Sequence, residues 1–564
     1  MTTSPIQEEE LTTPNDLAHS TEATSKQQDT RVEALDPACL LPQHQINLWR
    51  LVIKPSIITP EVWHAAYPGH GTENEPFVVD FLPNDPLNPQ NWPGSRKWFC
   101  VAIVAIATLG VSYCTSAYLS ALPQLREHFN VSDQIITLGL SFFILGFALG
   151  PLLWGPLSEE YGRQPCYIGT YTVLTLFNIG VTVSNSISTI IVLRFFAGAF
   201  GASPLANSGG VVADMFRSQD RGVGIAAWSA CAFIGPAIGP IVSNFVAEYA
   251  GWRWVMGIMT IFAAVMWIVG SLLVPETYAP VILRRRARKL SQLTGKRHIS
   301  IYEQRSGTSQ NTSEKIRKVL IRPWVLLFHE PIVMLISVYM AILYATLFLL
   351  LGAFPVVFAE TRGWSQGISG LPFIGICIGM ISGAGHMIYD NRRYLNHIQR
   401  PDGEVPEVRL PPGLLGAVIT PLGMFLFAWT NYPSIHWIVC LIGIAVFCHG
   451  SVLVFLSGMN YLLDSYTIFA ASVLAANALL RAVLAAAFPL FTRQMYHNLG
   501  IHWASSIPAF LALSCSPAPF IFYRYGKQIR MKCKYAALAY EYGLIQKNAA
   551  RKPPETTEVK VTVG

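Results

Sequence analysis

The chain has 564 residues, of which 52% are hydrophobic and only 13% are charged, and its formal net charge is +7. A soluble globular protein has about a quarter charged residues, so this composition excludes an ordinary soluble enzyme and predicts an all-α integral membrane protein. The positive charge does not indicate nucleic-acid binding, because residues 275–330 alone hold twelve Lys or Arg against four acids.

Residues 1–97 precede the first apolar run and are predicted to form a cytoplasmic N-terminal region. Its first part, residues 1–35, is rich in Thr, Glu, Ser and Gln and is expected to be disordered. The region has no basic start followed by a short apolar core and a small-residue cleavage site, so a cleaved signal peptide is not expected.

Twelve apolar stretches follow in two sets of six, each long enough to cross a bilayer as a helix of about 20 residues. Backbone polar groups find no water partner in lipid, so each stretch is predicted to be helical. The fold is therefore expected to hold two six-helix bundles, within residues 98–274 and 331–523. The spans are predicted at 98–119, 134–157, 166–184, 188–213, 222–247 and 254–274, then at 331–358, 368–389, 412–430, 436–461, 466–490 and 502–523.

The orientation is predicted from the loops. Lys and Arg concentrate in the cytoplasmic loops of membrane proteins. The linker 275–330 is basic, and five Lys or Arg follow the last span at the start of the tail 524–564, whereas the loop 431–436 carries no Lys or Arg. Both termini and the linker are therefore expected in the cytoplasm, with the lipid bilayer as the surrounding partner.

The loop between the second and third spans reads Gly155-Pro-Leu-Ser-Glu-Glu-Tyr-Gly-Arg-Gln-Pro165. Gly155 and Gly162 allow a tight turn. Glu159 is suited to cap a neighbouring helix start, where the dipole is positive, and Arg163 is expected at the cytoplasmic surface. These charges are predicted to form a latch that is made in one conformation and broken in another.

Partners of this loop are expected at two places. Asp214 and Arg221 flank the turn after the fourth span and are predicted to join the latch. After the eighth span, Asp390, Arg392 and Arg393 occupy the matching place and are interpreted as a degenerate second copy.

Two further patterns lie inside spans. Arg194 heads the run Arg194-Phe-Phe-Ala-Gly-Ala-Phe-Gly201 in the fourth span, where a guanidinium is costly and needs partners. The fifth span contains Gly235-Pro-Ala-Ile-Gly-Pro240. Pro236 and Pro240 remove backbone donors and are expected to kink the helix, while Gly235 and Gly239 let another helix lie against it. The alternatives are a purely structural arginine and an ordinary kink.

These patterns resemble those of the major facilitator superfamily. The loop is similar to its G-x-L-x-D-x-x-G-R-[KR] signature, although Glu159 and Gln164 depart from the usual Asp and base. The Arg194 run resembles R-x-x-x-G-x-G, and the fifth span resembles the G-P-x-x-G pattern of antiporters. Other stretches narrow the resemblance, over roughly residues 85–525, to the fungal twelve-span drug:proton antiporters: Asp85-Pro-Leu-Asn-Pro-Gln-Asn-Trp92, Pro275-Glu-Thr-Tyr-Ala-Pro280, Glu330-Pro-Ile-Val, Ala470-Ala-Ser-Val-Leu-Ala-Ala-Asn477 and Phe488-Pro-Leu-Phe491.

The resemblance implies the major facilitator fold and a proton-coupled exporter of a drug, toxin, organic acid or secondary metabolite. It ties Arg194 to proton coupling and associates the fifth-span pattern with export. It further implies a monomer in the plasma membrane, with the vacuolar membrane as the alternative.

The charged residues inside the spans favour particular substrates. No Asp or Glu lies at mid-depth, whereas Arg194, Arg481 and His449 lie within spans. Anionic or neutral small molecules are therefore favoured over cations. The candidates for the substrate cavity are aromatic and polar, with packing or lipid contact as the alternative for each: Tyr339, Tyr344, His449, Asn460, Asn477 and Arg481. On the outer side, Asn130-Val-Ser132 is a glycosylation sequon.

Three other functions remain open. An importer on the same fold is disfavoured by the Gly235-Pro236 pattern. A membrane-embedded enzyme needs clustered catalytic side chains, but the histidines are scattered and no HExxH, GxSxG or phosphate loop stands in a fitting context, so no catalytic residue, metal or cofactor is expected. A non-transporting sensor would carry a longer cytoplasmic tail than the 41 residues after Tyr523.

Overall fold

The computed structural model describes residues 48–53, 56–216, 220–306, 312–398 and 405–541. The predicted disorder of residues 1–35 lies outside these ranges. The chain forms two compact units. The small unit comprises Met1–Leu87 with Ile282–Ser306, and the helical unit comprises Asn88–Val281 with Gly307–Gly564.

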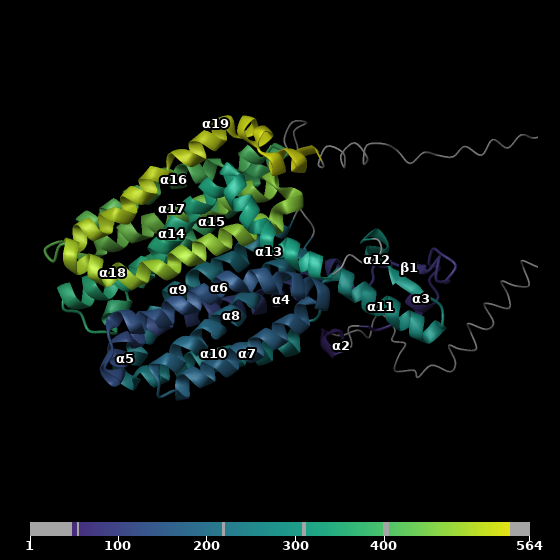
Figure 1. Ribbon diagram of the computed structural model, residues 1–564, viewed down its shortest axis with the longest axis horizontal. Helices are drawn as coiled ribbons and strands as arrows, with labels where there is room; N and C mark the ends of the chain where they lie inside the picture. The colour runs from purple at the N-terminus through teal and green to yellow at the C-terminus, as the bar shows by residue number, and fades with distance from the viewer. Residues whose placement is uncertain (1–47, 54–55, 217–219, 307–311, 399–404, 542–564) are drawn as a thin grey trace, which may run out of the picture. The chain divides into compact units, whose positions relative to one another are not determined.

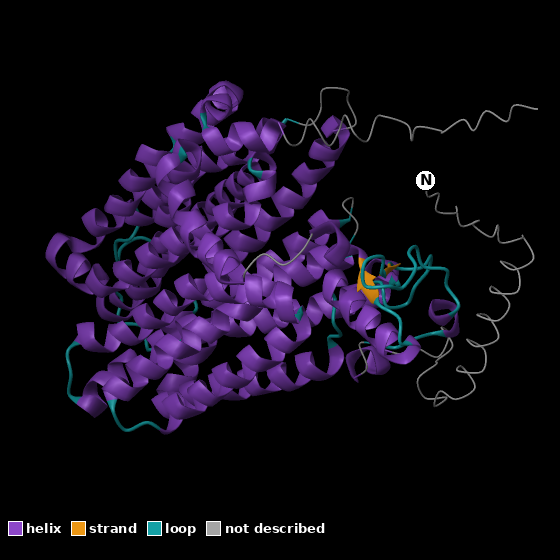
Figure 2. Cartoon of the chain, turned by 45° about the vertical axis from the view of Figure 1, so that its right-hand side comes forward, coloured by secondary structure: helices purple, strands orange, loops and turns teal. Residues whose placement is uncertain are grey.

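The small unit joins two segments that the sequence analysis treats as separate regions. Strand β1 (Phe77–Val79) pairs in parallel with β2 (His298–Ser300), as Figure 2 shows in orange. Short helices α2 (Leu48–Ile53), α3 (Pro60–Trp63) and α12 (Ile301–Ser306) and most of α11 (Ala279–Thr294) belong to the same unit. Its core is apolar and draws on both segments: Ile58, Val62, Trp63, Val79, Leu283, Ala287 and Leu290.

A buried ion pair ties the two segments of the small unit. Arg286 Nη1 and Nη2 lie 2.5 and 3.0 Å from the two carboxylate oxygens of Asp85, and both side chains are at most 1% exposed. The guanidinium also lies 5.7 Å from the ring of Phe81. A bidentate pair of this kind fixes the relative orientation of the two side chains and also neutralises their charges.

Replacing Asp85 with Asn should open the small unit, because it leaves the buried Arg286 charge without a counter-ion; breaking a buried pair costs about 3–5 kcal/mol. Limited proteolysis of the full-length protein measures this, since cleavage tracks the open population, and cleavage within residues 56–87 should accelerate about tenfold or more. Glu73→Gln is the matched control, because Glu73 pairs with Arg297 at 3.6 Å while 90% exposed. Unchanged protection in the Asp85→Asn protein would contradict this role.

The helical unit contains two sets of membrane-spanning helices (Figure 1). The first set is α4 (Gly94–Ala117), α6 (Asp133–Tyr161), α7 (Arg163–Val183), α8 (Ile187–Met215), α9 (Arg221–Ala250) and α10 (Trp252–Leu273). Helix α5 (Leu122–Phe129) links α4 to α6 and ends at the exposed Asn130, whose φ is 48°. Helix α13 (Thr312–His329) precedes the second set.

The second set is α14 (Pro331–Phe354), α15 (Phe373–Ile398), α16 (Pro411–Trp429), α17 (Trp437–Ser465), α18 (Ala470–Cys515) and α19 (Pro517–Lys532). Eleven stretches of the described residues are long and apolar enough to span a membrane, and the last, Thr467–Lys532, covers both final predicted spans. Gly500 divides it, because its φ of 74° is not helical. The predicted all-α membrane fold is confirmed.

The two sets pack in the same pattern. In the first set α4 contacts α9 and α6 contacts α8; in the second, α14 contacts α18 and α15 contacts α17. These are corresponding helices, namely first with fifth and second with fourth in each set. The sets meet where α6 contacts α18 and where α9 contacts α15.

Candidate functional site

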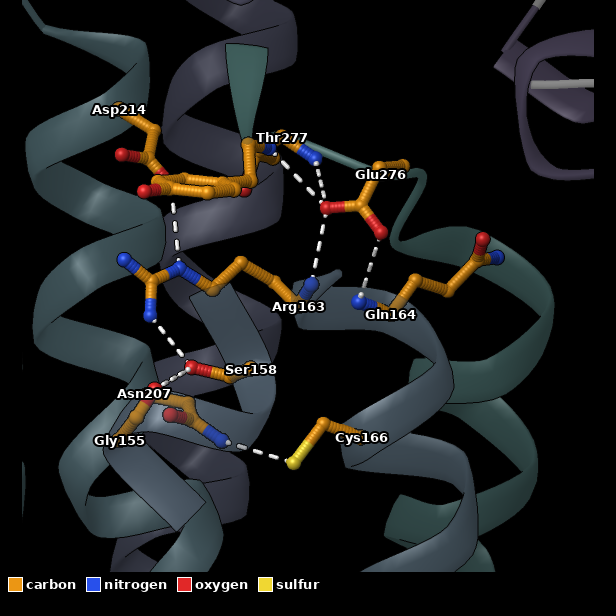
Figure 3. Close-up of polar contacts among 10 residues, drawn as sticks. Gly155, Ser158, Arg163, Gln164, Cys166, Asn207, Asp214, Glu276 and Thr277 are labelled. Atoms are coloured by element: carbon orange, nitrogen blue, oxygen red, sulfur yellow. Dashed lines mark hydrogen bonds and ion pairs between the residues drawn. The ribbon is translucent and has the colours of Figure 1, made fainter. Parts of the chain in front are cut away.

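The predicted latch is built around Arg163, the first residue of α7 (Figure 3). Its Nε lies 3.3 Å from Asp214 Oδ2 near the end of α8, and Nη1 donates to Ser158 Oγ at 2.6 Å. The guanidinium lies 4.8 Å from the ring of Tyr278. Gly210 makes room for it, because a Cβ there would lie 2.8 Å from the guanidinium. The pair is 11% and 19% exposed, so it is less screened than a surface ion pair.

Glu276 is the acid that caps α7. It is 3% exposed, and its carboxylate accepts from the backbone N–H of Arg163 at 2.9 Å and of Gln164 at 3.4 Å. The N–H groups of Thr277 and Tyr278 donate to it as well, each at 3.0 Å. The first N–H groups of a helix have no partner within the helix, and a negative charge there opposes the positive end of its dipole. We call Arg163, Asp214 and Glu276 the latch cluster.

Glu159, which the sequence predicts in that capping role, is instead exposed near the end of α6, and Glu276 caps α7 in its place. Gly162 follows with φ of 110°, and a side chain there would collide with the Glu276 carboxylate. The Gly155 carbonyl accepts from Ser158 Oγ at 2.8 Å. Arg221 begins α9 and, within the described residues, shares no hydrogen bond or ion pair with the latch cluster.

A matching ion pair lies in the second set. Arg409 precedes α16, and its Nε lies 3.0 Å from Asp464 Oδ2 near the end of α17. The guanidinium lies 3.1 Å from the centre of the Tyr394 ring. Because α16 and α17 are the ninth and tenth spans, as α7 and α8 are the third and fourth, this pair repeats the Arg163–Asp214 arrangement.

The predicted second copy of the loop therefore has a different base. Asp390 and Arg393 lie three residues apart on α15 and pair with each other at 2.8 Å. Arg392 is exposed. The base that pairs with the tenth span is Arg409, which lies just before α16 rather than on α15.

Arg194 is fully buried in α8, and within the described part of the chain it contacts no acid. Its Nε donates to the Gly139 carbonyl at 2.8 Å and its Nη2 to the Cys114 carbonyl at 3.2 Å. The guanidinium lies 4.2 Å from the Tyr118 ring and 4.6 Å from the Phe143 ring, while Nη1 has no hydrogen-bond partner among the described residues. Arg194 thus joins α8 to α4 and α6 through backbone carbonyls.

The glycines of the fifth-span pattern face α4. A Cβ at Gly235 would lie 2.9 Å from the Leu109 carbonyl oxygen, and one at Gly239 would lie 2.9 Å from the Ala117 nitrogen. Both approaches are too close for any side chain, so α9 and α4 touch through backbone. The two prolines of the pattern lie inside α9: Pro236 and Pro240.

The opposite end of the helical unit carries a second group of polar contacts. Arg493 of α18 lies 2.6 Å from Asp133 and 2.9 Å from Glu360. The Gly367 N–H donates to Glu248 at 2.5 Å. Asp133 and Glu248 belong to the first set and the other three residues to the second. These contacts, called here the end ties, hold the two sets together at that end.

Of the six predicted cavity residues, the structure brings two together. The Arg481 guanidinium of α18 lies 4.8 Å from the Tyr344 ring of α14 and 4.9 Å from the Phe455 ring of α17. Phe455 in turn meets Phe233 of α9 edge to face, with ring centroids 4.9 Å apart. Neither phenylalanine is predicted from the sequence, because nothing there distinguishes them from other aromatic residues within the spans.

Tyr339 and Asn477 lie inside the second set instead. Tyr339 is 2% exposed and lines a small pocket with Gly413 and Ser457. Asn477 is 5% exposed and donates to Ser337 at 3.3 Å, which holds α18 against α14. Both side chains therefore lie among the helices of the second set.

His449 and Asn460 lie on an outward stripe of α17. At 100° per residue, both fall within about 40° of Ile438 and Ile442 around the helix. These isoleucines are 47% and 51% exposed. His449 bonds Ser382 of α15 at 2.8 Å. Neither position matches a cavity facing the first set.

Comparison with known proteins agrees with this geometry. The family model described as Major Facilitator Superfamily matches residues 104–489. The chain is 49% identical to the major facilitator superfamily multidrug transporter mdrA of Aspergillus fumigatus, over 93% of this chain and 86% of that protein. It is 51% identical to the MFS-type efflux pump MFS2 of Trichophyton rubrum, over 90% and 85%. Among solved structures, the partially occluded inward-open xylose transporter XylE of E. coli aligns with a TM-score of 0.54 at 16% identity, covering 77% of this chain and 98% of that one, which shows the fold alone.

Proposed function

The chain belongs to the major facilitator superfamily, and on this premise we propose that it exports a small organic compound by alternating access, driven by the proton gradient. The names of the relatives, a multidrug transporter and an efflux pump, favour export over import and transport over catalysis. The compound belongs to a broad class: a secondary metabolite, toxin, organic acid or drug.

The observation that carries the proposal is the pair of contact groups at opposite ends of the helical unit. The latch cluster is buried at one end, and the end ties cross between the two sets at the other. Alternating access requires that one end open while the other is held closed. The end ties supply a contact between the two sets at one end, and the latch cluster, whose members all belong to the first set, is proposed to change its contacts as the other end opens. Arg194 supports coupling because it is a charge buried between three spans.

The remaining features of the proposal follow from charge. The latch end faces the cytoplasm, because the basic residues after the last span lie there. The substrate is anionic or neutral rather than cationic, since the spans hold basic but no acidic groups at mid-depth. The protein resides in the plasma membrane as a monomer.

Metabolite profiling tests the function. Compounds inside and outside a host that lacks this chain are compared with those of the same host expressing it, with and without a protonophore. Export predicts a compound that leaves only when the chain and the gradient are both present. Accumulation inside the cell would reverse the direction, and export that persists after collapse of the gradient would remove the proton coupling.

A further inference from the structure

Arg481 differs from Arg194, which also lies deep within a span. Arg194 is fully buried and donates to backbone carbonyls. Arg481 is only partly buried, and among the described residues its guanidinium has no hydrogen-bond acceptor and no acidic partner. Its contacts are with the rings of Tyr344 and Phe455, which stabilise a positive charge but accept none of its N–H groups. The guanidinium donors are therefore available to a ligand.

The residues around Arg481 lie in one layer of the helical unit. Counted from the helix ends on the latch side, Phe233 is 12 residues into α9, Tyr344 is 13 into α14, Phe455 is 10 into α17 and Arg481 is 11 into α18. At 1.5 Å per residue these positions lie about 15–20 Å from that end, near the middle of a bilayer core. The layer joins both sets, because Phe233 belongs to the first and the rest to the second.

We propose that Arg481, Tyr344, Phe455 and Phe233 form a binding subsite for the carboxylate and ring of a planar aromatic acid. This rests on the proposed function and names the substrate class. Two guanidinium N–H groups match the two oxygens of a carboxylate, and a flat ring stacks on the aromatic side chains. A cation would meet an uncompensated like charge, and a neutral ester would lose the paired hydrogen bonds.

Binding of a ligand at this subsite would also affect the contact between Phe455 of the second set and Phe233 of the first set. Phe455 contacts both the Arg481 guanidinium and the ring of Phe233 from the first set. A ring that inserts beside Phe455 competes with Phe233 for contact with that side chain. Binding therefore changes the contact that the two sets make at mid-depth, which is where alternating access needs the substrate to act.

Equilibrium binding to the purified full-length protein in lipid nanodiscs tests the subsite. The probes are 2-naphthoate, its neutral analogue 2-naphthylmethanol, its cationic analogue 2-naphthylmethylammonium, and the non-planar cyclohexanecarboxylate, with empty nanodiscs subtracted. The wild type should bind 2-naphthoate about tenfold or more tightly than each of the others. Equal or preferred binding of the cation, or no binding of 2-naphthoate, would overturn the proposal.

Variants assign the effect to Arg481. Arg481→Gln should lose about tenfold or more in 2-naphthoate affinity, and Arg481→Lys should recover part of it, because an ammonium is a point charge without the planar fork. Phe455→Leu should weaken the preference for 2-naphthoate over cyclohexanecarboxylate. Lys527→Gln removes the same charge from an exposed site on α19 and should bind as the wild type does.

Two readouts keep the conclusions separate. Gel filtration and thermal unfolding identify a variant that fails to fold, and Arg481→Lys then carries the test. Undiminished 2-naphthoate binding by a folded Arg481→Gln protein refutes the subsite, even if metabolite export is gradient-driven. Conversely, Arg481-dependent binding without gradient-driven export would refute the proposed coupling and leave the subsite standing.

Discussion

Replacing Arg194 with alanine is expected to reduce gradient-driven export to the level of cells that lack the chain, while the protein still reaches the membrane. The side chain is fully buried and connects α8 to carbonyl groups of α4 and α6. Its charge is balanced by carbonyls and aromatic faces rather than by a carboxylate. Any change in the packing of these three helices must therefore change the environment of the charge, which is what proton coupling requires.

Export of the identified compound, normalised to the amount of protein in the membrane fraction, measures this effect. Arg194→Lys should retain part of the activity, because it keeps a donor and a charge but not the geometry of the guanidinium. Exchange of labelled compound without a gradient distinguishes coupling from structure: a coupling arginine leaves exchange intact, whereas a purely structural one abolishes both. Full export by the alanine protein would refute the assignment.

Replacing Glu276 with Gln is expected to lower export about tenfold or more, while Glu159→Gln changes it less than about twofold. The Glu276 carboxylate accepts four backbone N–H groups and is 3% exposed. An amide has one acceptor oxygen and turns two donors toward groups that are donors themselves, so buried N–H groups lose their partners. Glu159 is exposed, and its neutralisation removes no such contact.

The Glu276→Gln and Glu159→Gln variants carry the same chemical change at neighbouring sites. A difference in their export rates therefore reports the role of the carboxylate that caps α7. Transport rates in the two variants, at matched membrane levels, give the result. Gly162→Ala provides an independent check, because its Cβ would collide with the Glu276 carboxylate and its φ of 110° disfavours any side chain. Stronger inhibition by Glu159→Gln than by Glu276→Gln would restore the assignment that the sequence alone suggested.

The spans were predictable because lipid imposes one rule along the whole chain: a long apolar stretch must be helical. The predicted span 412–430, for example, corresponds to α16 at Pro411–Trp429. The predicted gap between the last two spans, residues 491–501, contains Gly500, whose backbone interrupts a helix that otherwise continues to Cys515.

The sequence predicts contacts of Arg163 with nearby residues of its own loop better than contacts with residues far along the chain. Glu159 lies in the same short loop as Arg163, whereas Glu276 is 113 residues from Arg163. The fold brings the end of α10 beside the start of α7, and no single sequence reveals that neighbour. The run Pro275-Glu-Thr-Tyr resembles a family feature, but the sequence does not reveal which residues it contacts.

The structure brings only Tyr344 and Arg481 of the six cavity candidates together, because the sequence does not reveal which way each helix face points. Within a membrane span the lipid-facing and the packed sides are both apolar, so the helical period that orients a soluble helix is weak. His449 and Asn477 were therefore selected by residue type alone and lie elsewhere. Arg481 stands out in the sequence because a charge inside a span is rare and needs a specific environment.

The ion pair of the small unit has a consequence for the order of events during synthesis. Asp85 and Arg286 are separated by 201 residues, and all six helices of the first set lie between them. At about 5–20 residues per second, Asp85 leaves the ribosome about 10–40 s before its partner exists. The small unit can therefore fold only after the first six spans have been synthesised. Its folding follows the synthesis of half of the membrane-spanning helices.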